Sequence, residues 1–273
     1  MDRINRRLVA ACVAVCAIGG ALGGAGAAGA NSVFEAGERG RVASIEDGDS
    51  LTLEGGQIVR LAQIEAPRIR DGDPAGPQAR AALQGLVGAG PVELRYGGLR
   101  RDRRGRALAQ VFATRQGGEV WVQEELLRAG MARVHTYADN RRDVGRLWAA
   151  EREARRAGRG IWAMPAYQVR FATPEALSGA IRTFVLMEGT VTAVERRGTV
   201  ILVGFGADRA TDVTAVVPET ALPLWQGGEA AINALRGRLI RVRGYVRMDR
   251  GPSVWVDHPE QIEFIRPAAT TPR

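Results

Sequence analysis

The feature that most constrains the fold is a series of short apolar segments over residues 39–162, separated by glycine turns and interrupted by helical stretches. Between residues 39 and 64, apolar and polar side chains alternate around turns at Asp47-Gly48 and Gly55-Gly56, which predicts three short strands. Further strands are expected at 91–96 and 107–113, and helices at 75–87, 122–129 and 142–157. Five short strands with inserted helices predict a five-stranded Greek-key barrel of the OB type.

A second strand-rich block runs from residue 183 to residue 266. Its strands are expected at 184–194, 199–205, 212–217, 238–247, 253–257 and 261–265, with a helix around 228–236. This pattern predicts a second OB-like barrel, so the fold class is mainly β with inserted helices. We therefore expect a first domain over 31–163, a linker over 164–182, an accessory domain over 183–266 and a disordered tail over 267–273.

The first 30 residues have the features of a secretory signal peptide. Arg3, Arg6 and Arg7 form a basic start, an apolar run follows, and Ala28-Gly29-Ala30 fits a cleavage site. We expect an exported protein, periplasmic or extracellular, with no stable membrane span after cleavage; an uncleaved N-terminal anchor is the alternative. Both cysteines lie in this segment, so disulfides and thiol chemistry are excluded from the mature chain.

The charge of the chain points to a polyanionic partner. The formal net charge is +8, the isoelectric point is about 10.7, and all 38 basic residues are arginine. Basic proteins of this kind commonly bind nucleic acid. Because arginine stays charged and presents a planar fork of donors, every phosphate contact would be made by a permanently charged, bidentate group.

Carboxylates and arginines alternate along residues 45–109. Asp47 and Asp49 occupy the first turn, Arg60 and Glu65 follow on the next strands, and Arg106 closes the basic run Asp102-Arg103-Arg104-Gly105-Arg106. Carboxylate oxygens can hold a divalent cation, and guanidinium groups can clamp phosphate oxygens. The pattern is therefore an inventory for phosphodiester chemistry, although Asp47-Gly48-Asp49 by itself would be no more than a tight turn.

At these residues the chain resembles the thermonuclease family, the staphylococcal-nuclease-like domains. The resemblance covers residues 39–162, keeps the three motifs in order and includes the closing Gly160-Ile161-Trp162. It implies an OB-type barrel with inserted helices. It also implies a calcium-dependent phosphodiesterase that acts on DNA and RNA with little base preference.

The resemblance also implies roles for particular residues. Asp49 and Glu65 would bind calcium with Asp47 near the ion, although the family usually has aspartate at the position of Glu65. Arg60 and Arg106 would clamp the scissile phosphate and serve as the catalytic arginines. The nucleic-acid-binding residues would be Arg103 and Arg104 on the basic loop and Tyr137, whose ring could stack on a base.

Arg68 departs from the family pattern. The family places a glutamate there, which positions or deprotonates the attacking water. Arginine has no acceptor and does not lose its proton, so it cannot act as this base. Loss of a general base costs about 10²–10⁴ in rate. The nearby Asp71 and Asp73 are candidates for a substitute carboxylate.

Three functions follow from the sequence. The first is an exported calcium-dependent nuclease, weak because of Arg68. The second is a non-catalytic nucleic-acid-binding protein on a nuclease fold, and the third is an envelope interaction module. In the accessory domain, Arg241 and Arg243 could follow a phosphate backbone with Trp255 as a stacking ring, or the domain could bind protein or cover the first domain. The sequence does not indicate an oligomeric state.

Overall fold

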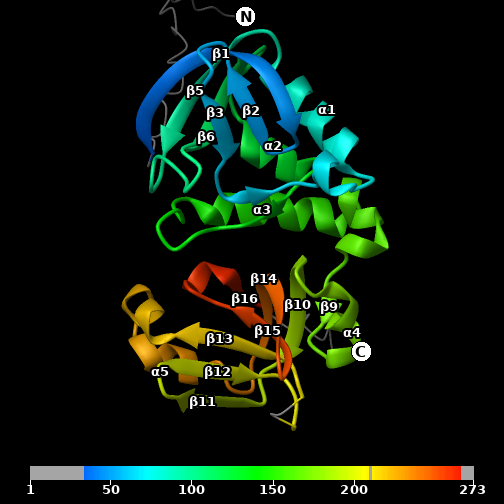
Figure 1. The fold of residues 1–273 in the computed structure, drawn as a ribbon, viewed down its shortest axis with the longest axis vertical. Helices are drawn as coiled ribbons and strands as arrows, with labels where there is room; N and C mark the ends of the chain where they lie inside the picture. Colours follow the sequence, from blue (N-terminus) through cyan, green and yellow to red (C-terminus); the bar gives the residue numbers. More distant parts are fainter. Residues whose placement is uncertain (1–33, 209–210, 266–273) are drawn as a thin grey trace, which may run out of the picture. The chain divides into compact units, whose positions relative to one another are not determined.

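The computed structural model describes residues 34–208 and 211–265 (Figure 1). The predicted signal peptide, residues 1–30, and the predicted tail, 267–273, lie outside these ranges, and both stay predictions. Within the described ranges, no helix is long and apolar enough to cross a membrane.

The first sheet forms a closed barrel. Its strands are β1 (Glu35–Asp47), β2 (Ser50–Leu53), β3 (Ile58–Leu61), β5 (Pro91–Tyr96) and β6 (Ala107–Arg115). They follow the order β3-β2-β1-β5-β6, and a parallel pairing of β3 with β6 closes the ring. β7 (Gly118–Trp121) extends β6 as a hairpin, and β4 (Ile64–Glu65) pairs with β8 (Arg133–Val134) beside the barrel. The expected five-stranded OB-type barrel is confirmed.

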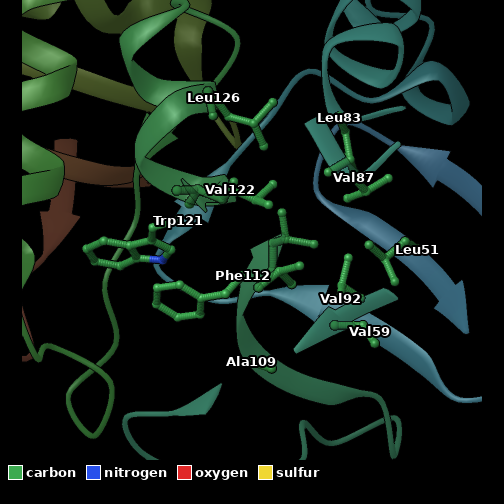
Figure 2. Close-up of a cluster of buried hydrophobic side chains, with 14 of the residues drawn as sticks. Leu51, Val59, Leu83, Val87, Val92, Ala109, Phe112, Trp121, Val122 and Leu126 are labelled. Atoms are coloured by element: carbon green, nitrogen blue, oxygen red, sulfur yellow. The ribbon is translucent and has the colours of Figure 1, made fainter. Parts of the chain in front are cut away.

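The barrel interior is filled by the apolar residues whose alternation predicts the strands. Leu51, Val59 and Val92 are fully buried, each on a different strand. Leu83 and Val87, on one stripe of α1 (Gly76–Val87), are buried with them (Figure 2). Burial of a leucine or valine side chain stabilises the fold by about 1.5–3 kcal/mol. The apolar stripe therefore fixes α1 against the end of the barrel where the β1–β2 turn lies.

Two more helices form at the predicted places: α2 (Val122–Arg128) packs on β6, and α3 (Val144–Arg156) packs on α2 and β8. A buried glutamine joins α2 to the barrel: Gln123 accepts a hydrogen bond from the N–H of Val111 at 3.0 Å and donates to the carbonyl of Ala109 at 2.9 Å. Because a buried amide without partners costs free energy, these bonds specify how α2 docks on β6.

The second block repeats the pairing pattern of the barrel. Its elements are β10 (Phe184–Thr190), β11 (Ala193–Arg197), β12 (Val200–Gly204), β13 (Thr214–Pro218), α5 (Gly228–Asn233), β14 (Leu239–Asp249), β15 (Gly251–Trp255) and β16 (Ile262–Phe264), with 3₁₀ turns at Glu219–Leu224 and Pro259–Gln261. The sheet runs β11-β12-β13-β15-β14-β10-β9, with β13 and β15 parallel, and β16 pairs with β14. The edge strand β9 (Arg170–Phe171) lies beyond β10, and β10 and β11 are consecutive in the chain, separated by two residues. The strand ladder itself is open, as in a partly open OB barrel.

Residues 164–182, expected to be a linker, carry short elements. These are β9 (Arg170–Phe171), α4 (Pro174–Leu177) and 3₁₀ turns at Pro165–Tyr167 and Ser178–Ala180; a further 3₁₀ turn, Gly160–Ala163, precedes the segment. β9 pairs with β10 in parallel, and Trp162 and Tyr167 are buried in one apolar cluster with Phe184. The proposed domain boundaries stay a prediction, but this segment is packed rather than extended.

Arg243 joins the two sheet regions through a buried ion-pair network. Its side chain is 1 % exposed, pairs with Glu151 of α3 at 3.0 Å and with Glu263 of β16, and donates to the carbonyl of Val134 at 2.9 Å. Burial would raise the pKa of Glu263, but the neighbouring arginines, Arg243 first, hold it below its usual value. Arg243 is therefore a structural residue and does not follow a phosphate backbone.

We predict that Arg243→Leu lowers the free energy of unfolding by up to about 3–5 kcal/mol, because Glu151 and Glu263 lose their shortest ion pairs and keep longer ones with Arg155, at 3.6 Å, and Arg241, at 3.3 Å. Arg247→Leu on the same strand is the control. Arg247 is exposed, so its replacement should change stability by less than about 1 kcal/mol. Urea unfolding of both variants measures the difference. Equal losses would show that the network contributes no more than a surface arginine.

Candidate functional site

The β1–β2 turn places two predicted metal ligands at the end of the barrel. Gly48 separates them, and a Cβ at this position would lie 2.5 Å from the Cβ of Ala79 on α1. Glycine therefore allows the turn to press against the helix. Asp49 is buried and accepts a hydrogen bond from the N–H of Ala66 at 3.0 Å, and Asp47 accepts one from the N–H of Ile69 at 2.9 Å. Both carboxylates are thus engaged in holding the segment after β4.

Arg60, on β3, is buried among acceptors. Its guanidinium lies 2.6 Å from Asp49 and 2.9 Å from Glu65, and it donates to the carbonyl of Ile64 at 3.0 Å. Burial opposes its charge, but the two carboxylates outweigh this effect and raise the pKa of Arg60. The predicted phosphate clamp is therefore already paired with the predicted metal ligands.

Glu65 is the centre of the site and has four donors around it. Arg60 binds one carboxylate oxygen and the ring of His135 lies 3.3 Å from the same atom. Arg68 lies 2.7 Å from the other oxygen, which also accepts a hydrogen bond from the Tyr245 hydroxyl at 2.9 Å. Burial would raise the pKa of Glu65, but His135, Arg60 and Arg68 together hold it far below its usual value. The carboxylate is ionised and fully engaged.

His135 is the neutral member of this group. Burial lowers its pKa, and the attraction of Glu65 offsets only part of the effect. Because Glu65 can only accept, we assign the proton to the His135 Nδ1, which faces the carboxylate. The imidazole therefore donates to Glu65 without carrying a charge.

These residues do not fit a calcium ion. Calcium takes six to eight oxygen ligands, whereas the Asp49 and Glu65 oxygens already accept from protein N–H and O–H groups. Across residues 34–208 and 211–265, no group of three or more Asp, Glu, His or Cys side chains is placed to hold a metal. Arg60 and Arg68 supply the positive charge that would otherwise come from the ion, and they would repel a second cation.

The two candidate substitute bases lie away from the cationic pocket beside this cluster. Asp73 accepts hydrogen bonds from the N–H of Ala75, at 3.0 Å, and from the Tyr167 hydroxyl. Asp71 lies 3.9 Å from Arg68 and 3.8 Å from Arg70. Neither side chain belongs to the wall of the cationic pocket, so neither takes the place of the glutamate that the family has at position 68.

A cationic pocket of about 460 Å³ opens beside this cluster. It brings together the predicted phosphate- and base-binding residues, while the predicted metal ligands Asp47, Asp49 and Glu65 are not part of its wall. Its charged wall consists of seven arginines and two aspartates: Arg60, Arg68, Arg70, Arg101, Arg103, Arg104, Arg106, Asp102 and Asp139. Leu99, Leu108 and Tyr137 complete it. Its size is typical of small-ligand sites, and its charge suits an anion.

Residues 99–106, which we call the arginine loop, form one side of the pocket. Asp102 organises the loop: it accepts hydrogen bonds from the N–H groups of Arg104, at 2.8 Å, and Arg106, at 3.0 Å, and pairs with the Arg106 guanidinium at 2.7 Å. Burial would raise the pKa of Asp102, but these bonds lower it. In the part of the chain that the structure describes, the exposed Arg103 and Arg104 side chains form no ion pair, so they can bind a ligand.

Three residues of the site could not be identified from the sequence motifs. Tyr245 lies 180 positions after Glu65, and no spacing rule connects the two. His135 stands alone in the sequence, yet its ring packs 4.7 Å from that of Tyr137 and brings that residue to the pocket. Asp102 reads as part of a solvated loop, and the structure shows that it sets the loop conformation.

Residues 58–164 match the family model described as staphylococcal nuclease homologue. The chain contains a thermonuclease-like domain. This domain is also similar to the probable staphylococcal-like nuclease CAN2 of Oryza sativa subsp. japonica, with 33 % identity over 105 residues, which are 38 % of this chain and 26 % of the relative. The probable staphylococcal-like nuclease CAN3 of the same plant is 32 % identical over 105 residues, 38 % of this chain and 25 % of the relative. The chain thus spans about a quarter of each relative's length.

The buried pair of Glu65 and His135 predicts that the thermonuclease-like domain loses stability in acid. A carboxyl group with a lowered pKa stabilises the fold above its unfolded pKa, near 4.3, and this contribution is lost as the pH falls. A histidine with a lowered pKa opposes protonation, so stability also falls as the pH drops through about 6.5. Both signs agree.

The melting temperature of the full chain, measured from pH 7 to pH 3, should therefore decrease throughout. Glu65→Gln should be less stable at pH 7, because Arg68 loses its close ion pair and Arg60 keeps only the one with Asp49, and its melting temperature should vary less below pH 5. A variant with the same dependence below pH 5 as the native protein would contradict this assignment.

Proposed function

We propose that the thermonuclease-like domain binds the phosphate backbone of nucleic acid without calcium-dependent hydrolysis. The observation that carries this proposal is the pairing of Glu65 with both Arg60 and Arg68 behind a pocket whose wall is dominated by arginine. The first arrangement removes the ligand set for a metal. The second provides permanently charged, bidentate donors for phosphate oxygens.

Nucleic acid is favoured over other polyanions by two features. The fold is that of nucleases, and the relatives named above are described as probable nucleases. The pocket also offers an aromatic ring, because Tyr137 is 38 % exposed in its wall. Arginine contacts to phosphate carry no sequence information, and stacking on a ring is tolerant of base identity. We therefore propose binding of DNA and RNA with little base preference.

The calcium-dependent nuclease predicted first from the sequence requires a metal and a base. Arg68 cannot act as a base, and Glu65 reaches no metal without breaking its pairs with two arginines. The arginines could still stabilise charge in a transition state. Cleavage is therefore measured together with binding.

We further propose export of the protein, on the basis of the basic start, apolar run and small-residue site in residues 1–30. Cell fractionation with N-terminal sequencing of the mature chain distinguishes a cleaved product from a retained anchor.

The binding test uses fluorescence anisotropy of the full chain with labelled single-stranded DNA and RNA, in calcium and in chelator. The affinity should be the same in both buffers. It should fall with salt, with a slope of about 0.7 per phosphate contact. Replacing both Arg103 and Arg104 by alanine removes one or two phosphate contacts and should therefore reduce that slope by about 0.7–1.4. Arg80→Ala, an exposed arginine on α1, is the matched control and should leave the slope unchanged.

The same samples are analysed by denaturing gel for cleavage. No calcium-dependent products should appear. Calcium-dependent cleavage, lost in Asp49→Ala, would contradict the proposal and establish the nuclease. If the protein showed no salt-dependent binding of DNA or RNA, the proposed binding function would be wrong, and the envelope interaction module would be favoured.

A further inference from the structure

We infer that the arginine loop has a second phosphate subsite on its other side, and that a single strand of nucleic acid crosses the loop to occupy both. This inference deepens the proposed function and rests on it. The second subsite is a cavity of about 320 Å³ between the arginine loop and the β2–β3 turn at Gly55-Gly56. Gly55, Gly56, Gln57 and Ile58, which form its far wall, have no role in the motifs that carry the family resemblance.

The wall of this cavity is strongly cationic. Arg101, Arg104 and Arg106 line it, and the wall residues include no acid. The same three arginines also line the 460 Å³ pocket. The two cavities therefore share one loop, and guanidinium groups between them can contact phosphates on either side.

The three arginines shared by the two cavities differ in how strongly they are paired with carboxylates. Arg106 is held by Asp102 at 2.7 Å. Arg101 is about half exposed, and the nearest carboxylate of Glu38 is 4.0 Å away. Arg104 has no ion pair among the described residues. At least two guanidinium groups can thus turn toward a phosphate in the second cavity without breaking a strong pair.

The opposite wall suits a nucleoside beside the phosphate. The β2–β3 turn presents backbone without a Cβ at Gly55 and Gly56, so a ligand can approach closely. Ile58, 47 % exposed, supplies an apolar surface for a sugar or base. The Gln57 side-chain nitrogen has no hydrogen-bond partner in the described structure, so a rotation of this side chain would provide a further donor.

The position of the two cavities on either side of one exposed loop selects a flexible ligand. A strand that occupies both must bend around the arginine loop within a few nucleotides. Duplex DNA resists such bending, because its persistence length is about 150 base pairs. Single strands bend freely, and proteins that bind them combine cationic grooves with aromatic rings. The ligand class is therefore a single-stranded oligonucleotide with consecutive phosphates.

A substitution at Gly55 would change the second cavity without changing the wall of the larger pocket. It lines this cavity but not the larger pocket. A Cβ added at Gly55 meets no atom within 4 Å, and its φ is not in the left-handed region, so substitution costs little strain. Gly55→Glu would place a negative charge among the three shared arginines.

The experiment measures binding of a 12-nucleotide oligothymidylate by the full chain over a range of salt. Gly55→Glu should weaken binding by roughly tenfold, the loss of about one charge-assisted contact, and lower the salt slope by about 0.7. Gly55→Gln, which has the same shape without the charge, should change binding less than about twofold. Gly85→Glu on α1, also exposed and open around its Cβ, controls for net charge and should behave like Gly55→Gln. A 12-base-pair duplex should compete poorly.

The failures are distinguishable. If the native protein does not bind the oligonucleotide, the proposed function fails and this inference with it. If the native protein binds and Gly55→Glu is no weaker than Gly85→Glu, the second subsite is wrong while the proposed function stands. Equal competition by single strand and duplex would likewise overturn the crossing of the loop. Melting curves of both glutamate variants confirm that folding is unchanged.

Discussion

The ion-pair cluster centred on Glu65 determines what this site can do. A buried carboxylate needs compensation, because desolvation of an unpaired charge costs several kcal/mol. In a metal site the ion provides it. Here Arg60 and Arg68 provide it, at 2.9 and 2.7 Å, with Tyr245 and His135 as further donors. Since each carboxylate oxygen already has partners, the cluster is balanced without a metal, and its chemistry changes from coordination to anion binding.

The second sheet region takes part in this arrangement. Tyr245 donates to Glu65 from β14, and two positions before it on the same strand Arg243 pairs with Glu151. One strand thus supplies a hydroxyl to the site and a guanidinium to α3. Removing either group would leave a buried carboxylate with fewer donors. The accessory region is therefore part of how the thermonuclease-like domain is stabilised, in addition to any binding role of its own.

Much of the fold follows from local patterns, and this explains which parts were predictable. Alternation around Gly55-Gly56 and the stripe through Ala79 and Leu83 report burial within a few residues, so β2, β3 and α1 lie where expected. The strands β4 and β8 have two residues each, which is too short to show an alternation of apolar and polar residues in the sequence. The resemblance to the thermonuclease family likewise implied that Arg60 and Arg106 act together, and both line the 460 Å³ pocket. The contact of Glu65 with Tyr245 depends on tertiary packing alone, and no local signal encodes it.

The most direct test of the account is a calorimetric titration of the native full chain with calcium, beside Arg68→Glu. The account predicts no saturable binding by the native protein up to roughly 1 mM calcium, the range of weak extracellular sites. It also predicts stronger calcium binding once Arg68 is replaced by an acid. Stoichiometric calcium binding by the native protein would contradict the central claim, because it would show that the Glu65 cluster opens to coordinate a metal despite its two arginines.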